Sequence, residues 1–271
     1  MEENNKEYKK RMVVTGATGA IGRALIDEGI RAGYEVLAVV HRTSARAEEL
    51  EHMEHCRVLR LDLSEYRSAM QEMEKQGVVW KADATSTDER SADAVTVDAN
   101  EAQTISGDIF FHLAWEASYG ARRDDLILQM KNVHAAMDAV RFAKQLGCKT
   151  FVGAGSQAEY GRVDKALRSD TTTDPETAYG SAKFCAGNLT RYYAEQEGLR
   201  HIWMRILSVY GPHDRAETMI STAVSRMMKN EETEFSPCEQ IWDYLYSADK
   251  ILYRVKNRSR NDYDIGECEV M

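Results

Sequence analysis

Three side chains whose types suit acid–base chemistry stand between residues 156 and 183. Tyr179 and Lys183 are four residues apart in a segment with a helical pattern, so both project from one face of the helix. An ammonium group near a phenol favours the phenolate, and bringing a tyrosine pKa from about 10 toward neutrality takes roughly 3 to 4 kcal/mol of differential interaction. Ser156 follows an apolar strand pattern and is placed to donate a hydrogen bond to a reacting oxygen. The set predicts chemistry at an oxygen atom of the substrate.

A glycine-rich turn near the N-terminus indicates that a dinucleotide binds beside these three side chains. The stretch RMVVTGATGAIGRAL, residues 11–25, predicts a strand, a turn and a helix. The turn carries three glycines, at Gly16, Gly19 and Gly22. Glycine allows a tight turn and close approach of the backbone to a pyrophosphate, while the helix N-terminus offers N–H groups to the phosphates. We expect the helix over residues 20–32 to end at Gly33.

The end of the second predicted strand, residues 35–40, indicates which dinucleotide fits. An acidic residue there suits the 2′-hydroxyl of NAD, and an arginine suits the 2′-phosphate of NADP. This chain has His41 and Arg42 at that place, with no Asp or Glu beside them. We therefore predict NADP as the cofactor, with NAD as the alternative. The next strand leads into Asp62 and Leu63, which are placed to hold the adenine.

Strand and helix patterns alternate along the chain. Further apolar runs predict strands over residues 57–61, 108–113, 150–152 and 201–207. A long helix is expected over residues 124–146, with one buried stripe formed by Leu126, Met130, Val133, Met137 and Val140. Asp174 and Pro175 are expected as the N-cap and first-turn residue of the helix that carries Tyr179. The alternation predicts an α/β fold with a mostly parallel sheet.

Residues 77–107 interrupt this alternation. The stretch holds six acidic residues against Lys81 and Arg90, with many Ala, Ser and Thr. Such a composition buries little, so we expect a surface insertion, in which the alternating residues 95–97 are compatible with an edge hairpin.

The global composition predicts a cytoplasmic protein with a small-molecule partner. The net charge of −9 over 271 residues argues against nucleic acid. No apolar run reaches the roughly 20 residues of a membrane span, and residues 1–10 have no apolar signal core. The five cysteines are scattered with no CxxC pair, which predicts reduced thiols and neither a disulfide framework nor a metal site.

Taken together, these motifs resemble the extended short-chain dehydrogenase/reductases, in particular the nucleotide-sugar epimerase/dehydratase family. The matching segments are TGATGAIG (15–22), DL (62–63), FHLAW (111–115), GSQAEYG (155–161), YGSAK (179–183) and RILSVYGP (205–212). They cover residues 11 to about 250 apart from 77–107. The resemblance implies a doubly wound, mostly parallel Rossmann sheet, with a NAD(P)-binding domain over residues 1–210 and a small substrate lobe over residues 211–271.

The resemblance also implies roles for single residues. Ser156, Tyr179 and Lys183 would form the catalytic triad, with Tyr179 as general acid/base and Lys183 on the nicotinamide ribose. The cofactor would contact Gly16, Thr18, Gly19, Ala20, Ile21, Gly22, His41, Arg42, Asp62, Leu63, Leu113, Ala114, Trp115, Tyr179 and Lys183. The nucleotide sugar would contact Ser156, Gln157, Ser208 and Trp242. The long helix and the helix of Tyr179 would pair across a two-fold axis as a homodimer interface.

Departures from the family pattern narrow the reaction. Dehydratases have an acid pair after the residue at the position of Ser156, whereas this chain has Gln157 and Ala158, so we do not expect dehydration. Fucose-type epimerase/reductases have a cysteine at the position of Ala158 and a histidine downstream of the YGP motif. This chain has neither residue. His213 follows the motif directly, and we interpret it as a solvated loop residue. Trp242 stands where the family usually has an arginine on the substrate pyrophosphate, so nucleotide recognition must differ.

Three hypotheses for the function follow. The first is a reductase, in which NADPH reduces a 4-keto group of a nucleotide-linked deoxysugar and Tyr179 protonates the oxygen. The second is a 4-epimerase with tightly held NAD, and the third is a sensor that binds NADP without turnover. Family members usually run several dozen residues past the position of Tyr246. We therefore expect a truncated substrate lobe, with cofactor binding retained and nucleotide-sugar binding weak or dependent on a partner subunit.

Overall fold

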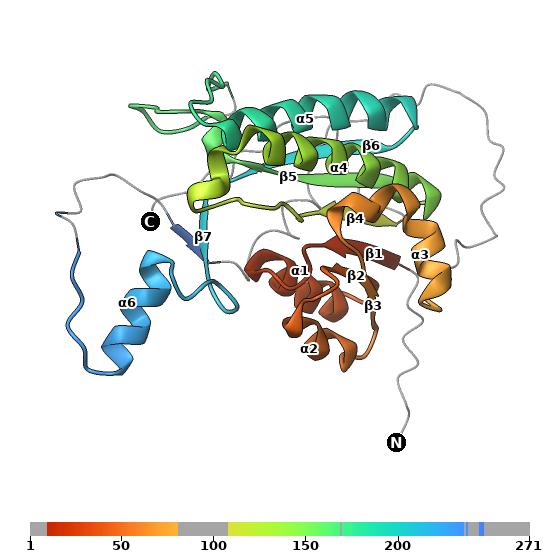
Figure 1. Ribbon diagram of the computed structural model, residues 1–271, viewed down its shortest axis with the longest axis horizontal. Coiled ribbons are helices and arrows are strands. Elements are labelled where there is room, and N and C mark those ends of the chain that lie inside the picture. The colour runs from red at the N-terminus through yellow and green to blue at the C-terminus, as the bar shows by residue number, and fades with distance from the viewer. Residues whose placement is uncertain (1–9, 81–107, 169, 236, 238–243, 247–271) are drawn as a thin grey trace, which may run out of the picture.

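A computed structural model describes residues 10–80, 108–168, 170–235, 237 and 244–246 (Figure 1). Its centre is a six-stranded sheet in the order β3-β2-β1-β4-β5-β6, in which all neighbouring strands are parallel. The strands are β1 (Lys10–Thr15), β2 (Tyr34–Val40), β3 (Cys56–Arg60), β4 (Ile109–His112), β5 (Thr150–Ser156) and β6 (Arg200–Ile206). The chain order reverses between β1 and β4, which is the place where open parallel sheets bind ligands.

Helices cover both faces of this sheet (Figure 1). The α-helices are α1 (Ala20–Arg31), α2 (Glu48–Glu51), α3 (Ala69–Lys75), α4 (Leu126–Gln145), α5 (Ala178–Gln196) and α6 (Met219–Met228). Short 3-10 helices are η1 (Ala45–Ala47), η2 (Leu63–Ser68), η3 (Ala121–Asp124) and η4 (Gln157–Glu159). One face carries α1 and α2, and the other carries α3, α4 and α5. The predicted doubly wound α/β fold is therefore confirmed.

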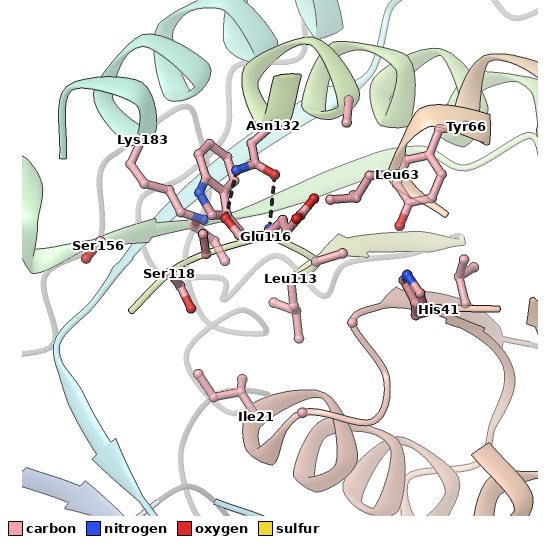
Figure 2. Close-up of a pocket in the computed structure, with 18 of the residues that line it drawn as sticks. Ile21, His41, Leu63, Tyr66, Leu113, Glu116, Ser118, Asn132, Ser156 and Lys183 are labelled. Carbon is pink, nitrogen blue, oxygen red and sulfur yellow. Dashed lines mark hydrogen bonds between the residues drawn. The ribbon is translucent and has the colours of Figure 1, made fainter. Parts of the chain in front are cut away.

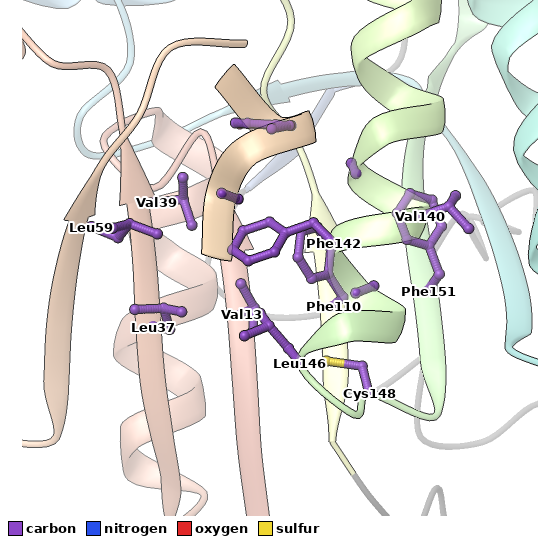
Figure 3. Packing of buried hydrophobic residues seen from close by; sticks show 14 of the residues in the cluster. Val13, Leu37, Val39, Leu59, Phe110, Val140, Phe142, Leu146, Cys148 and Phe151 are labelled. Carbon is purple, nitrogen blue, oxygen red and sulfur yellow. The ribbon is translucent and has the colours of Figure 1, made fainter. Parts of the chain in front are cut away.

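The central strands are buried on both faces, which explains their continuous apolar runs. Figure 3 shows the core under α3 and α4, where Val13, Leu37 and Phe110 of the sheet face Phe142 of α4. Phe110 lies edge-on to Phe142, with ring centroids 5.6 Å apart. The opposite face packs α1 and α2 onto the alternate side chains of the same strands. The sheet thus holds its carboxyl ends at fixed positions for the loops that follow.

Two element boundaries differ from the sequence-based expectation. Strand β5 continues through the small residues Gly153, Ala154 and Gly155 to Ser156, so Ser156 is the last residue of a buried strand. The predicted cap of α5 was wrong, because its N-cap is Thr177, whose hydroxyl accepts a hydrogen bond from the Gly180 N–H at 3.0 Å. A threonine directly before the helix satisfies the first-turn N–H groups more locally than an aspartate three residues earlier.

The buried stripe predicted for α4 is only partly correct. Val133 and Val140 are buried, whereas Leu126 and Met130 are 69% and 56% exposed. The core-facing side of α4 is instead centred on small residues such as Ala139, turned roughly 100° around the helix from the predicted stripe. Small side chains let α4 lie close to the sheet and to α5, and the larger apolar residues of the first turns remain outside.

A small second sheet lies beyond the main one. It pairs β7 (Ser208–Tyr210) with β8 (Tyr244–Tyr246) in parallel. The hairpin expected near residues 95–97 and the substrate residue Trp242 lie outside the described residues.

Three chemical features of the described part of the chain complete the fold. Its three cysteines, Cys56, Cys148 and Cys185, are free thiols. These residues contain no cluster of His, Cys, Asp and Glu suited to a metal ion. Within the same ranges, no helix has the length and apolarity to cross a lipid bilayer.

Candidate active site

A pocket of about 1240 Å³ opens at the carboxyl ends of the strands (Figure 2). Ile21 lies at one wall, His41 and Tyr66 at one end, and Ser156 and Lys183 at the other. Most of the predicted site residues line it, namely Gly16, Thr18, Gly19, Ile21, His41, Asp62, Leu63, Leu113, Ala114, Trp115, Ser156, Gln157, Tyr179 and Lys183. The pocket lining does not include Ala20, Gly22, Arg42 and Ser208.

The glycine turn between β1 and α1 fits a dinucleotide pyrophosphate. Gly16 has φ +69°, and a Cβ there would lie 2.9 Å from the backbone nitrogen of Ala114. A Cβ on Gly22 would lie 2.3 Å from the carbonyl oxygen of Gly16, so this residue lets the helix pack against the turn. Gly19 is the N-cap of α1 and supplies no side chain to the first-turn N–H groups. Those N–H groups are left for an anion in the pocket.

A pair of buried polar residues that the motifs did not reveal joins β1 to β4 beside this turn. The Thr15 hydroxyl lies 3.0 Å from His112 Nδ1 and accepts a hydrogen bond from the Ala114 N–H at 3.2 Å. Burial lowers the pKa of His112 to about 3, so the ring is neutral. These contacts fix the start of the loop that carries Trp115.

At the adenosine end of the pocket, Arg42 does not lie where the sequence predicts a ligand of the 2′-phosphate of NADP. The Arg42 guanidinium donates from Nη2 to Glu65 Oε1 and to Glu72 Oε2, both at 2.6 Å, and from Nε to Glu65 Oε2 at 2.7 Å. Arg42 is therefore turned toward two carboxylates and away from the pocket. His41 does line the pocket, with Nε2 3.2 Å from Asp62 Oδ1.

Ser156, Tyr179 and Lys183 meet at the other end of the pocket. Tyr179 is 8% exposed, and burial raises the pKa of its phenol, opposed by a hydrogen bond with Ser156 and by the charge of Arg123. Ser156 lies at the end of β5, where its hydroxyl also accepts from the Ala158 N–H at 3.2 Å. The triad expected from the sequence is thus brought together in space.

Lys183 is buried and its ammonium group contacts a backbone carbonyl and an aromatic ring. Its Nζ donates to the Ala154 carbonyl oxygen at 2.7 Å and lies 3.7 Å from the centroid of the Trp115 ring. The distance from Nζ to the Tyr179 ring centroid is 5.8 Å. Burial lowers the pKa of Lys183 from 10.5 to about 7, against the raising effect of Glu159. The lysine therefore titrates near neutral pH.

This titration predicts a pH-dependent stability. The folded chain releases the Lys183 proton near pH 7 and the unfolded chain releases it near 10.5, so the unfolded chain holds more protons between these values. Stability of the wild type relative to Lys183→Met should therefore rise with pH over this window, by on the order of a few kcal/mol in total. Denaturant unfolding of both proteins at about pH 7 and about pH 9.5 measures the difference. An unchanged difference would contradict the assigned titration.

Glu159 is a buried support of the site that sequence reasoning did not single out. Its carboxylate accepts hydrogen bonds from the Ser156 N–H at 2.8 Å, from Trp203 Nε1 at 3.1 Å and from Arg205 Nε at 2.9 Å. Arg205 also donates to the Tyr160 hydroxyl at 3.1 Å. The only sequence signal is a carboxylate three residues after Ser156, which makes a capping box at η4.

Two buried amides on α4 shape the loop that follows β4. Gln129 accepts from Trp115 Nε1 at 2.8 Å and donates to the carbonyls of Ala117 and Arg123 at 3.2 and 3.0 Å. Asn132 accepts from the Glu116 N–H and donates to its carbonyl, as the dashed lines of Figure 2 show. These contacts hold the Trp115 ring against Lys183.

Comparison with known proteins identifies relatives over most of the chain. The model of the NAD dependent epimerase/dehydratase family matches residues 12–255. A protein named uncharacterized UDP-glucose epimerase YtcB, from Bacillus subtilis (strain 168), is 24% identical over 157 residues, which are 56% of this chain and 49% of that protein. UDP-glucuronic acid decarboxylase 1 of Xenopus tropicalis is 22% identical over 257 residues, which are 91% of this chain and 53% of that protein. The chain spans about half the length of these curated relatives.

A solved structure shares the fold. UDP-glucuronic acid 4-epimerase from Bacillus cereus, in complex with NAD, superposes with a TM-score of 0.66 at 19% identity. The match covers 90% of this chain and 72% of that one.

Proposed function

The chain belongs to the NAD dependent epimerase/dehydratase family, and we propose that it is a 4-epimerase of a nucleotide-linked sugar that uses bound NAD. The observation that carries this proposal is the meeting of Ser156, Tyr179 and Lys183 at one end of a pocket whose other parts suit a dinucleotide. The relatives named for UDP-glucose and UDP-glucuronic acid support a UDP-sugar as substrate.

The residues of the pocket divide between cofactor and substrate. Gly16, Thr18, Gly19 and Ile21 would hold the pyrophosphate, and Lys183 would bind the nicotinamide ribose. At the adenosine end the pocket offers His41, Asp62 and Leu63. When bound, NAD supplies a reversible acceptor for a hydride.

Tyr179 supplies the acid–base chemistry in this proposal. In its phenolate form Tyr179 would take the proton of the sugar C4 hydroxyl as the C4 hydride leaves for NAD, and would return that proton to the oxygen when the hydride comes back to the opposite face of C4. Ser156 donates a hydrogen bond to the same oxygen, which places it next to Tyr179. Trp115 and the Ala154 carbonyl fix the position of Lys183.

The residues after Ser156 in the pocket do not fit a dehydratase. Gln157 lines the pocket at the place where dehydratases have an acid, and Ala158 follows it. Glu159 is fully buried and bonded to Arg205, so its carboxylate is directed to the core. No carboxylate of this segment is available to remove a proton from sugar carbon.

The ion pairs of Arg42 with Glu65 and Glu72 favour NAD over NADP as the cofactor. The reductase hypothesis relied on Arg42 as a ligand of the 2′-phosphate, and the ion pairs with Glu65 and Glu72 remove that support. We therefore expect Arg42→Ala to change the dissociation constants of NAD and NADP alike, with their ratio constant within about threefold, because no phosphate contact is lost. Calorimetric titration measures both constants, and Arg31→Ala, an exposed arginine at the end of α1, is the control. A loss of affinity for NADP alone in Arg42→Ala would restore the reductase hypothesis.

Product analysis tests the proposed reaction. The purified protein is incubated with NAD and, in separate reactions, with UDP-glucose and UDP-glucuronic acid, and the sugars are separated by chromatography. An epimerase gives the 4-epimer with no net change in nicotinamide absorbance. Consumption of NADPH with a 4-keto sugar would instead identify a reductase, and binding of cofactor without any product would identify a sensor.

We further propose a homodimer formed by the outer faces of α4 and α5. These helices lie side by side in Figure 1 and expose five large apolar side chains, namely Leu126, Ile127, Met130, Leu189 and Tyr192. Such a two-fold contact buries the same patch on both copies. Light scattering should give a dimer for the wild type and for Met227→Lys on α6, and a monomer for Met130→Lys. A monomeric wild type at micromolar concentration would contradict the proposal.

A further inference from the structure

The phenol ring of Tyr179 contacts a cation that does not belong to the triad. The Cζ of Arg123 lies 4.6 Å from the ring centroid, within the range of a cation–π contact. The ring of Trp115 meets the same phenol edge-on, with centroids 6.2 Å apart and planes at 89°. Arg123 comes from η3, at the end of the loop that follows β4, so the contact joins that loop to α5.

Local hydrogen bonds hold Arg123 in this place. Its carbonyl accepts from Gln129 Nε2 at 3.0 Å, and Oδ1 of the next residue, Asp124, accepts from the Ala178 N–H at 3.0 Å. The second bond ties η3 to the first residue of α5, immediately before Tyr179. The turn is therefore tied to the start of the helix that carries Tyr179.

The guanidinium itself has few other contacts. Its Nε is buried without a hydrogen-bond partner, and no carboxylate of the described residues forms an ion pair with Arg123. The neighbouring Arg122, in contrast, is exposed and pairs with Glu116 at 3.2 Å. The charge of Arg123 is thus directed at the aromatic ring.

Charged and polar groups from four elements face Tyr179. Ser156 of β5 hydrogen-bonds the phenol, and Glu159 of η4 opposes its ionisation. Lys183 of α5 is farther from the ring than Arg123, with Nζ at 5.8 Å from the centroid and bonded to a carbonyl. The charge of Arg123 lowers the pKa of Tyr179, against the larger raising effect of burial.

We propose that Arg123 is a positioning residue that holds the Tyr179 ring and stabilises its phenolate from the ring face. A cation over the ring interacts more favourably with a phenolate than with a phenol, so its removal shifts the ionisation equilibrium. The inference rests on the proposed function only in taking Tyr179 as the acid–base group. Ionisation of Tyr179 can be measured without turnover.

Carbon-13 NMR of protein labelled at tyrosine Cζ follows this ionisation. The chain has 13 tyrosines, and the resonance missing from Tyr179→Phe assigns the one of interest. We expect Arg123→Met and Arg123→Gln to reduce the ionisation constant of Tyr179 by about tenfold, which is one pKa unit. Arg123→Lys should recover most of the effect, and Arg122→Met should have none.

Several outcomes would overturn the inference. These are an unchanged Tyr179 titration in both neutral variants, an equal shift in Arg122→Met, or no recovery in Arg123→Lys. The two neutral variants differ in shape, so the loss of folding in one leaves the other as a test. If the shift is found but no epimerase activity exists, the proposed function fails and this inference stands. If epimerase activity exists without the shift, only this inference fails.

Discussion

Replacement of Tyr179 by phenylalanine is expected to reduce turnover by a factor of about 10² or more, the usual scale for loss of a general acid. The substitution removes only the hydroxyl, and the ring contacts with Trp115 and Arg123 remain. Cofactor affinity should therefore change by only a few fold. Steady-state rates and calorimetric titration with NAD measure the two effects separately.

A second tyrosine of the same helix provides the control. Tyr192 is exposed on α5, and Tyr192→Phe should retain the wild-type rate. Equal activity of Tyr179→Phe and the wild type would remove Tyr179 from the mechanism. A large loss of NAD affinity in Tyr179→Phe would show that the hydroxyl serves binding.

Replacement of Glu159 by alanine should have the largest effect on stability. Glu159 is 0% exposed and its partner Arg205 is also buried, so the variant leaves a guanidinium charge in the core without its carboxylate. Removal of one member of a buried pair typically costs 3–5 kcal/mol, and we expect a loss of about that size. Denaturant unfolding measures it. The same variant should reduce turnover, because the carboxylate also accepts the Ser156 N–H.

The exposed pair of Arg162 and Glu176 gives the matched control. These side chains are 3.2 Å apart and well exposed, so Glu176→Ala should change the free energy of unfolding by at most about 1 kcal/mol. Equal effects of Glu159→Ala and Glu176→Ala would show that the buried network does not support the fold.

The parts of the fold and site that the sequence predicts are those encoded locally. The glycine turn and the Tyr179–Lys183 spacing lie within single stretches, and their neighbours in the chain set their geometry. The apolar run over residues 150–152 predicted a strand just before Ser156, and the structure extends that strand through Ser156 itself. Parallel strands then bring these ends together at one edge of the sheet.

The unpredicted parts depend on partners far apart in the chain. Thr15 and His112 are separated by 97 residues, and Glu159 and Arg205 by 46. The prediction for Arg42 used only its place at a strand end, whereas its carboxylate partners come from later elements, Glu65 from η2 and Glu72 from α3. Arg123 has no motif at all, and its contact with Tyr179 follows from the docking of η3 on α5.

The most direct test of the proposed epimerase follows the hydrogen at C4. UDP-glucose and UDP-glucuronic acid, each labelled with deuterium at C4, are incubated in separate reactions with the purified protein and NAD, and the products are examined by NMR and mass spectrometry. The account predicts the 4-epimer with the deuterium retained at C4 and no net reduced nicotinamide. Formation of no 4-epimer from either sugar, or of a product that requires NADPH in stoichiometric amount, would contradict it.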